Sequence, residues 1–204
     1  MMAPLVATLR DGQAVIVATD TVYGLAARPG SAGYAHIFEL KDRPMSQVLP
    51  WLVSGADALD ALAIDVPAYA YRLAQMFWPG ALTLVLRASD AACELGGVAV
   101  DKTIALRCPD DADLLALLGE LEGPLACTSA NIHGQTAVSS KDELHESLAV
   151  LPGADELPAY CQGGQASTIV DCTGTYPKIL REGPIPEQVI LDVAMFGATL
   201  TSHE

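Results

Sequence analysis

Short apolar runs alternate with helix-like segments along most of this chain, and this alternation limits the fold more than any other feature. "ALTLVLRA" at 81–88 and "TIALRCP" at 103–109 are typical of buried strands. "DADLLALLGEL" at 111–121 has the spacing of an amphipathic helix with an acidic first turn. Two predicted strands, 167–174 and 178–183, follow each other with no helix between them. The pattern therefore predicts an α/β fold with a twisted mixed parallel and antiparallel sheet flanked by helices.

Proline and capping residues predict where further elements begin and end. A helix at 31–41 starts at Ser31, which can cap it, and stops before Pro44. A strand at 48–53 contains Pro50, which restricts it to a sheet edge or a bulge. The other predicted elements are strands at 14–18, 124–128 and 159–162 and helices at 56–63, 66–78, 140–151 and 186–197.

A single domain spanning 1–204 is expected. The chain has 204 residues, of which 51% are hydrophobic, and no repeat or linker-like segment divides it. No basic segment followed by an apolar stretch marks a signal peptide, and every apolar run is far shorter than the roughly 20 residues that cross a bilayer. We therefore expect a cytoplasmic protein without a membrane partner. The five cysteines lack a CxxC pair, which favours buried free thiols over disulfides or a zinc site.

The chain is strongly acidic, with 11 Lys and Arg against 25 Asp and Glu and a formal net charge of -14. This balance opposes nonspecific nucleic-acid binding, which depends on cations that neutralise phosphates. It also opposes the capture of any polyanion, unless the few cations are gathered in one cleft. The common phosphate-loop, dinucleotide-binding, zinc-protease and serine-hydrolase motifs are absent.

Four of the cations stand at the ends of predicted elements. "KDRP" at 41–44 places Lys41 and Arg43 at the end of a helix, where they bind an anionic ligand or complement the helix dipole. Arg107 and Arg181 each end an apolar run, so each needs either an anionic ligand or a structural carboxylate. From these segments alone, both alternatives remain open.

Short polar side chains also follow two of the predicted strands. "TDT" at 19–21 comes directly after the strand at 14–18, and Gly24 permits a tight backbone path there. Such residues either contact a ligand or form a turn that satisfies its own hydroxyls. "TSAN" at 128–131 offers hydroxyl and amide groups that can donate to phosphate oxygens.

The order of these segments is more specific than any one of them. "TDTVYGLA", "KDRP", "WPGALTLVL", "TIALRCP", "TSANIHG", "STIVD" and "ILREG" resemble, in this order, the YrdC-like family of threonylcarbamoyl-AMP synthases in its single-domain form. The resemblance covers about 15–183, and 184–204 is a C-terminal extension. The family's KxR…SxN signature is matched by Lys41, Arg43, Ser129 and Asn131.

The resemblance implies a nucleotidyltransferase that converts L-threonine, bicarbonate and ATP into threonylcarbamoyl-AMP and pyrophosphate. Downstream tRNA threonylcarbamoyl transferase proteins are the implied partners, and they use the product to make threonylcarbamoyladenosine in tRNA. Weak or no direct tRNA binding is expected, because the chain is acidic. Mg²⁺ is expected to accompany ATP, and no protein ligands are assigned to it, although Asp20 is a candidate.

The family pattern also implies roles for individual residues. Lys41 and Arg43 are the implied catalytic residues, because they hold the phosphates of ATP where charge develops. The implied threonine ligands are Thr21, Arg107 and Ser167. The implied ATP ligands are Lys41, Arg43, Gln47, Thr103, Ser129, Asn131 and Arg181.

The chain departs from the family pattern in the loop after Arg43. Val48 stands where the family commonly has a proline, and the next proline is Pro50.

Two other functions remain open. One is a YrdC-like nucleotide- or RNA-binding protein without synthase activity, although such relatives often lack part of the signature. The other is carbamoyl transfer in hydrogenase maturation, in which a similar domain belongs to a much longer chain.

Overall fold

The computed structural model of the protein describes residues 2–132, 134–161 and 163–196. The helical elements are α1 (Met2–Arg10), α2 (Ala32–Lys41), α3 (Ala58–Leu62), α4 (Ala68–Phe77), α5 (Asp90–Leu95), α6 (Ala112–Leu121), the 3-10 turn η1 (Lys141–Glu143) and α7 (Glu187–Phe196). The strands are β1 (Val15–Val17), β2 (Gly24–Ala27), β3 (Trp51–Leu52), β4 (Ala63–Ile64), β5 (Leu82–Ala88), β6 (Thr103–Arg107), β7 (Leu125–Ser129), β8 (Thr168–Asp171) and β9 (Lys178–Arg181).

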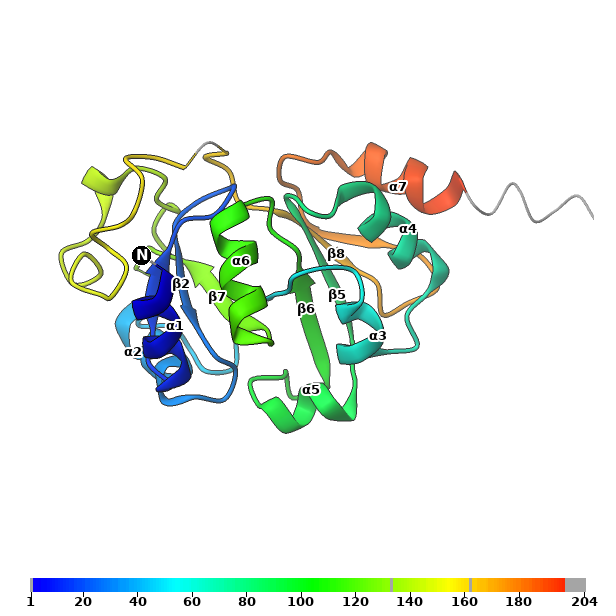
Figure 1. Cartoon of the computed structure of the whole chain (residues 1–204). Coiled ribbons are helices and arrows are strands. Elements are labelled where there is room, and N and C mark those ends of the chain that lie inside the picture. Colours follow the sequence, from blue (N-terminus) through cyan, green and yellow to red (C-terminus); the bar gives the residue numbers. More distant parts are fainter. Residues whose placement is uncertain (1, 133, 162, 197–204) are drawn as a thin grey trace, which may run out of the picture.

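The strands form one mixed sheet in the order β1-β2-β7-β3-β6-β5-β8-β9, with β4 paired to β5. The β3–β6 and β5–β8 pairs are parallel, and the other pairs are antiparallel. Figure 1 shows α1 and α6 side by side over the β1, β2 and β7 end of the sheet, with α4 and α7 together at the other end. The predicted mixed α/β fold with flanking helices is therefore confirmed.

Apolar cores cover both faces of the sheet, because successive strand residues point to opposite sides. Val15 and Val17 of β1 pack with α1 and α6, whereas Ile16 between them belongs to the larger core that includes α2 and α4. The described helices include none that is both long and apolar enough to cross a membrane. Four of the five free cysteines are buried, as predicted, but Cys93 is exposed.

Capping residues place the two helices that matter most for the site. The Ser31 hydroxyl accepts a hydrogen bond from the Tyr34 N–H at 3.2 Å and starts α2. Asp42 ends α2 in a left-handed conformation, with a φ of 52°. The Asp111 carboxylate accepts from the Leu114 N–H at 2.9 Å and starts α6. Both helices are confirmed, and α2 delivers Lys41 at its last position.

Two predicted elements of the long β7–β8 connection are wrong. The segment 140–151 contains the turn η1 instead of a helix, and Ser147 donates its N–H to His145 Nδ1 at 3.3 Å. Such local side-chain contacts compete with the helical ladder. The described part of 159–162 makes an isolated bridge between Ser140 and Tyr160 instead of a strand. Gln162 and the end of the C-terminal extension, 197–204, lie outside the described residues.

The prediction that Pro50 restricts its strand to a sheet edge or a bulge is also wrong. β3 is an interior strand, because it pairs with both β6 and β7. Pro50 lies just before the paired residues, so its missing N–H is not needed there, while its carbonyl accepts from the Cys127 N–H at 2.8 Å. The elements α1, α5, β2 and β4 were not predicted.

Gly33 is expected to tolerate no side chain, because α2 approaches the start of β1 very closely there. A Cβ at Gly33 would lie 2.4 Å from the Ala14 backbone nitrogen. Gly33→Ala is expected to cost about 1–3 kcal/mol through this overlap, a drop in melting temperature of about 3–10 °C for a domain of this size. Gly55→Ala is the control, since nothing lies within 4 Å of its added Cβ. Equal melting temperatures for the two variants would contradict the expectation.

Candidate functional site

Lys41 is a buried cation at the C-terminal end of α2, with a relative exposure of 1%. Its ammonium donates to the backbone carbonyls of Ser129 and Asn131, and it also contacts Asn131 Oδ1 at 3.3 Å. Burial, and then the neighbouring Arg43, lower the pKa of Lys41 to about 8. No carboxylate among the described residues pairs with Lys41. The protein therefore holds a positive charge here that an anionic ligand can match.

Arg43 lies two residues beyond the end of α2 and shapes the loop that departs from the family pattern. Its Nε donates to the Gln47 carbonyl at 2.9 Å, and Nη2 contacts the Val48 carbonyl at 3.4 Å. Burial lowers the pKa of the Arg43 guanidinium. No carboxylate in the described part of the chain neutralises it either. Gln47 uses its backbone in this contact, and the residue itself is exposed.

Asn131 joins the end of β7 to the loop that follows it. Its Nδ2 donates to the carbonyls of Ile132 at 3.0 Å and Gln135 at 2.8 Å, while Oδ1 faces Lys41. Ser129 ends β7 opposite Gly24 in β2. The structure thus brings together Lys41, Arg43, Ser129 and Asn131, the four residues of the signature, although they come from two distant segments.

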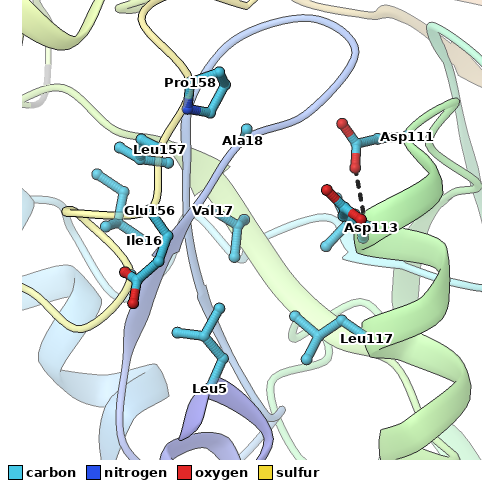
Figure 2. Close-up of a pocket in the computed structure, with 12 residues that line it drawn as sticks. Leu5, Ile16, Val17, Ala18, Asp111, Asp113, Leu117, Glu156, Leu157 and Pro158 are labelled. Carbon is cyan, nitrogen blue, oxygen red and sulfur yellow. Dashed lines mark hydrogen bonds between the residues drawn. The ribbon is translucent and has the colours of Figure 1, made fainter. Parts of the chain in front are cut away.

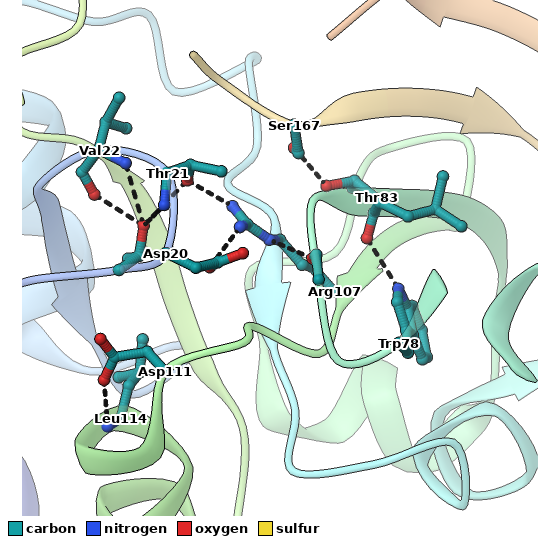
Figure 3. Close-up of polar contacts among 12 residues, drawn as sticks. Asp20, Thr21, Val22, Trp78, Thr83, Arg107, Asp111, Leu114 and Ser167 are labelled. Atoms are coloured by element: carbon teal, nitrogen blue, oxygen red, sulfur yellow. Dashed lines mark hydrogen bonds and ion pairs between the residues drawn. The ribbon is translucent and has the colours of Figure 1, made fainter. Parts of the chain in front are cut away.

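Thr21 and Arg107 form a second polar group, which Figure 3 shows together with Asp20. Arg107 Nη1 donates to Thr21 Oγ1 at 2.9 Å, and Nη2 pairs with Asp20 Oδ1 at 2.6 Å. Arg107 Nε donates to the Gly80 carbonyl at 3.1 Å. Both Thr21 and Arg107 are buried, and Thr21 Oγ1 also contacts Thr19 Oγ1 at 2.9 Å.

Ser167 contacts both Thr83 and Arg181. Its hydroxyl is 2.8 Å from the hydroxyl of Thr83 in β5 (Figure 3). Arg181 Nη2 donates to the Ser167 carbonyl at 2.7 Å. Burial, and then the charge of Arg107, lower the pKa of Arg181. Ser167 and Arg181 therefore contact each other, and the influence of Arg107 on Arg181 indicates that this pair lies near the group of Thr21 and Arg107.

Two predicted ATP ligands are not brought to these groups. Thr103 begins β6 and Arg107 ends it, so about 13 Å of strand separates them. The Thr103 hydroxyl donates to Asp101 Oδ1 at 2.8 Å. Gln47 presents its carbonyl to Arg43, as described above. Both assignments stay predictions that this arrangement does not favour.

Sequence reasoning missed Thr83 as a member of the site. A threonine inside the apolar run of β5 is a weak signal, because β-branched residues are common in strands. Asp20 was considered as a metal ligand, but its Oδ1 is engaged by Arg107. No group of three or more His, Cys, Asp or Glu that could hold a metal occurs in the part of the chain that the structure describes.

A cavity of about 550 Å³ lies near the site but contains none of the predicted ligands. Figure 2 shows it between β1, α6 and the segment 153–158, with Asp111, Asp113 and Glu156 among apolar side chains. Carboxylates without cations do not suit phosphate, so the polar groups around Lys41 and Arg107 are the better candidate site. There, Lys41, Arg43 and Arg181 pair with no carboxylate in the described part of the chain, so they can bind a polyanion despite the net charge of -14.

Known proteins have sequences similar to this chain over most of its length. The Sua5/YciO/YrdC family model, described as "Telomere recombination", matches residues 7–183. A Mycobacterium leprae (strain TN) protein, named provisionally as a threonylcarbamoyl-AMP synthase, is 37% identical over 94% of this chain and 87% of its own length. The threonylcarbamoyl-AMP synthase of Bacillus subtilis (strain 168) is 31% identical over 93% of this chain and 55% of its own length.

Solved structures agree with the sequence comparison. Pyrococcus abyssi Sua5, crystallised with L-threonine, has 32% identity and a TM-score of 0.81 over 94% of this chain. The match covers 56% of the Sua5 chain, so this protein spans about half of that relative. Escherichia coli YciO has a TM-score of 0.76 at 22% identity, which indicates a shared fold alone.

Proposed function

This chain belongs to the Sua5/YciO/YrdC family, and we propose that it is an L-threonylcarbamoyladenylate synthase. It forms threonylcarbamoyl-AMP and pyrophosphate from L-threonine, bicarbonate and ATP. The observation that carries the proposal is the buried Lys41 ammonium, which has backbone carbonyls and an amide as partners but no carboxylate among the described residues. A charge held in this way suits the phosphates of a nucleotide. The names of the relatives support the same reaction.

The two polar groups divide the substrates between them. Lys41 and Arg43, with Ser129 and Asn131, hold the triphosphate, and Arg181 adds a further cation for ATP. Thr21, Arg107 and Ser167 hold threonine, with the Arg107 guanidinium on its carboxylate. Because Arg107 lowers the pKa of Arg181, the two guanidiniums lie near each other, and the two substrates can meet between them.

The chemistry requires positioning and charge stabilisation from the protein. The amine of threonine and bicarbonate form a carbamate with loss of water, and a carbamate oxygen then attacks the α-phosphorus as pyrophosphate leaves. Negative charge grows on the leaving group, where Lys41 and Arg43 stabilise it. Mg²⁺ carried by ATP would neutralise phosphate charge when bound.

Pyrophosphate release tests the proposal directly. The purified chain is incubated with L-threonine, bicarbonate, ATP and Mg²⁺, and pyrophosphate is measured together with the adenylate product. We expect release that depends on both threonine and bicarbonate. ATP binding without any threonine-dependent pyrophosphate would instead favour the alternative, a YrdC-like nucleotide- or RNA-binding protein without synthase activity.

The affinity for ATP is expected to fall at alkaline pH. The pKa of Lys41 is lowered to about 8 in the free protein, so its ammonium is charged below that pH and neutral above it. Bound phosphate favours the charged form, so ATP should bind about tenfold more weakly at pH 9.5 than at pH 7.5. Calorimetry at both values measures this ratio, with Lys41→Met as the control that should lose most of it. A wild-type affinity that stays constant would contradict the phosphate contact.

The location and the partners follow from the proposed product. We place the protein in the cytoplasm, where downstream tRNA threonylcarbamoyl transferase proteins consume threonylcarbamoyl-AMP. The net charge of -14 supports weak or no direct tRNA binding by the isolated chain. The adenylate therefore passes to its acceptor through those proteins.

A further inference from the structure

In the ion pair of Arg107 and Asp20, each side chain keeps polar atoms that have no hydrogen-bond partner among the described residues. A guanidinium has five N–H donors, and Arg107 uses three of them, on Gly80, Thr21 and Asp20. Asp20 accepts through Oδ1, and no described residue donates to its Oδ2. The side chains of Arg107 and Asp20 remain 9% and 14% exposed, so a small ligand can reach them.

The loop that carries Asp20 is held by contacts other than the ion pair. Thr19 Oγ1 accepts from the Thr21 and Val22 N–H groups at 3.1 and 3.2 Å and donates to the Val22 carbonyl at 2.7 Å. The Thr21 carbonyl accepts from the Gly164 N–H at 2.7 Å. These contacts hold Asp20 beside Arg107, and Figure 3 shows the resulting ion pair. Such preorganisation is expected of a binding group.

The charges of this region suit a zwitterion better than a simple anion. Arg107 contributes one guanidinium and Asp20 contributes one carboxylate, and the two lie side by side as an ion pair. An anion on Arg107 alone would approach the Asp20 carboxylate and be repelled. An α-amino acid carries its nitrogen and its carboxylate carbon only about 2.5 Å apart. The carboxylate of the amino acid can therefore face Arg107 while its amino group faces Asp20.

We infer that Asp20 binds the amino group of the substrate threonine, while Arg107 binds its carboxylate. This inference rests on the proposed function and assigns the recognition of the reacting nitrogen to a residue outside the KxR…SxN signature. Asp20 is then a substrate-binding residue that selects α-amino acids over hydroxy acids and points their nitrogen into the site. The competing interpretation is a purely structural ion pair that supports the loop.

A ligand that lacks the amino group separates these interpretations. Binding of L-threonine and of 3-hydroxybutyrate, which is threonine without its amino group, is measured by calorimetry on the full chain. Wild type is expected to prefer threonine by about tenfold to a hundredfold, the usual effect of one hydrogen bond to a charged group. Asp20→Asn keeps an oxygen for Arg107 but loses the charge, so it should bind both ligands alike. ATP affinity should be unchanged.

The matched control is Asp111→Asn. Asp111 is a second carboxylate close to Asp20, and asparagine preserves its helix cap. This variant should keep the wild-type preference for threonine. If Asp20→Asn also keeps that preference, the inference is wrong and the ion pair is structural. If wild type binds no threonine at all, the proposed function itself fails, which is a different result.

A measurement on wild type covers the case in which Asp20→Asn does not fold. The carboxyl carbon of Asp20, followed by carbon NMR, is expected to shift when threonine binds and to respond much less to 3-hydroxybutyrate. Asp20→Glu, which keeps the charge, should retain most of the preference. An Asp20 carboxyl carbon whose chemical shift changes with neither ligand would overturn the inference.

Discussion

Lys41→Met is expected to weaken ATP binding by about thirtyfold to several thousandfold. Methionine has a similar length and is apolar, so the change removes the buried ammonium without leaving a large cavity. Truncating one partner of a buried charged contact usually costs about 2–5 kcal/mol. Threonine binding should change little, because Lys41 contacts Ser129 and Asn131, whereas Arg107 and Thr21 form the other group. Separate calorimetric titrations with ATP and threonine measure the two affinities.

Lys141→Met is the matched control for this variant. Lys141 also donates to a backbone carbonyl, that of Asp155 at 3.1 Å, but it lies in the exposed turn η1. Its replacement should leave both affinities within about twofold of wild type, because exposed charges contribute little. An unchanged ATP affinity in Lys41→Met, with the protein folded, would remove the main support for the phosphate site.

Arg43→Ala is expected to lower kcat/KM by about thirtyfold to a thousandfold. The reason is the loss of a guanidinium whose remaining N–H groups can stabilise the charge that develops on the leaving phosphates. Arg43→Lys should recover little of this loss, since an ammonium has no planar fork. The melting temperature should fall only slightly, because Arg43 contacts two backbone carbonyls and no described carboxylate. Steady-state kinetics and thermal unfolding measure the two effects.

Arg10→Ala is the matched control for Arg43→Ala. Arg10 likewise donates to a carbonyl, that of Glu120 at 2.7 Å, but it joins α1 to the end of α6. Arg10→Ala should lower the melting temperature about as much as Arg43→Ala does, but it should leave kcat/KM unchanged. If Arg43→Ala were instead less stable but fully active, Arg43 would serve the loop at 44–48 and not the reaction.

The strands and helices with strong local signals could be predicted from the sequence. The run at 81–88 contains β5, and the capped segment 31–41 contains α2, because apolar periodicity and capping act within a few residues. The same logic failed at 140–151, where the pattern suits a helix but local contacts formed a turn. Interior placement of β3 also escaped prediction, since the two strands that enclose it are distant in sequence.

The candidate site was likewise predictable from the sequence only in part. The sequence by itself determined which residue types were available, and their order along the chain identified Lys41, Arg43, Ser129 and Asn131 through the family resemblance. Only the tertiary structure decided which of them meet: it buried Lys41 against the end of β7, paired Arg107 with Asp20, and left Thr103 at the far end of β6. Partners 86 or more residues apart depend on how a mixed sheet orders its strands. That order follows from packing across the whole molecule, which no local pattern of residues records.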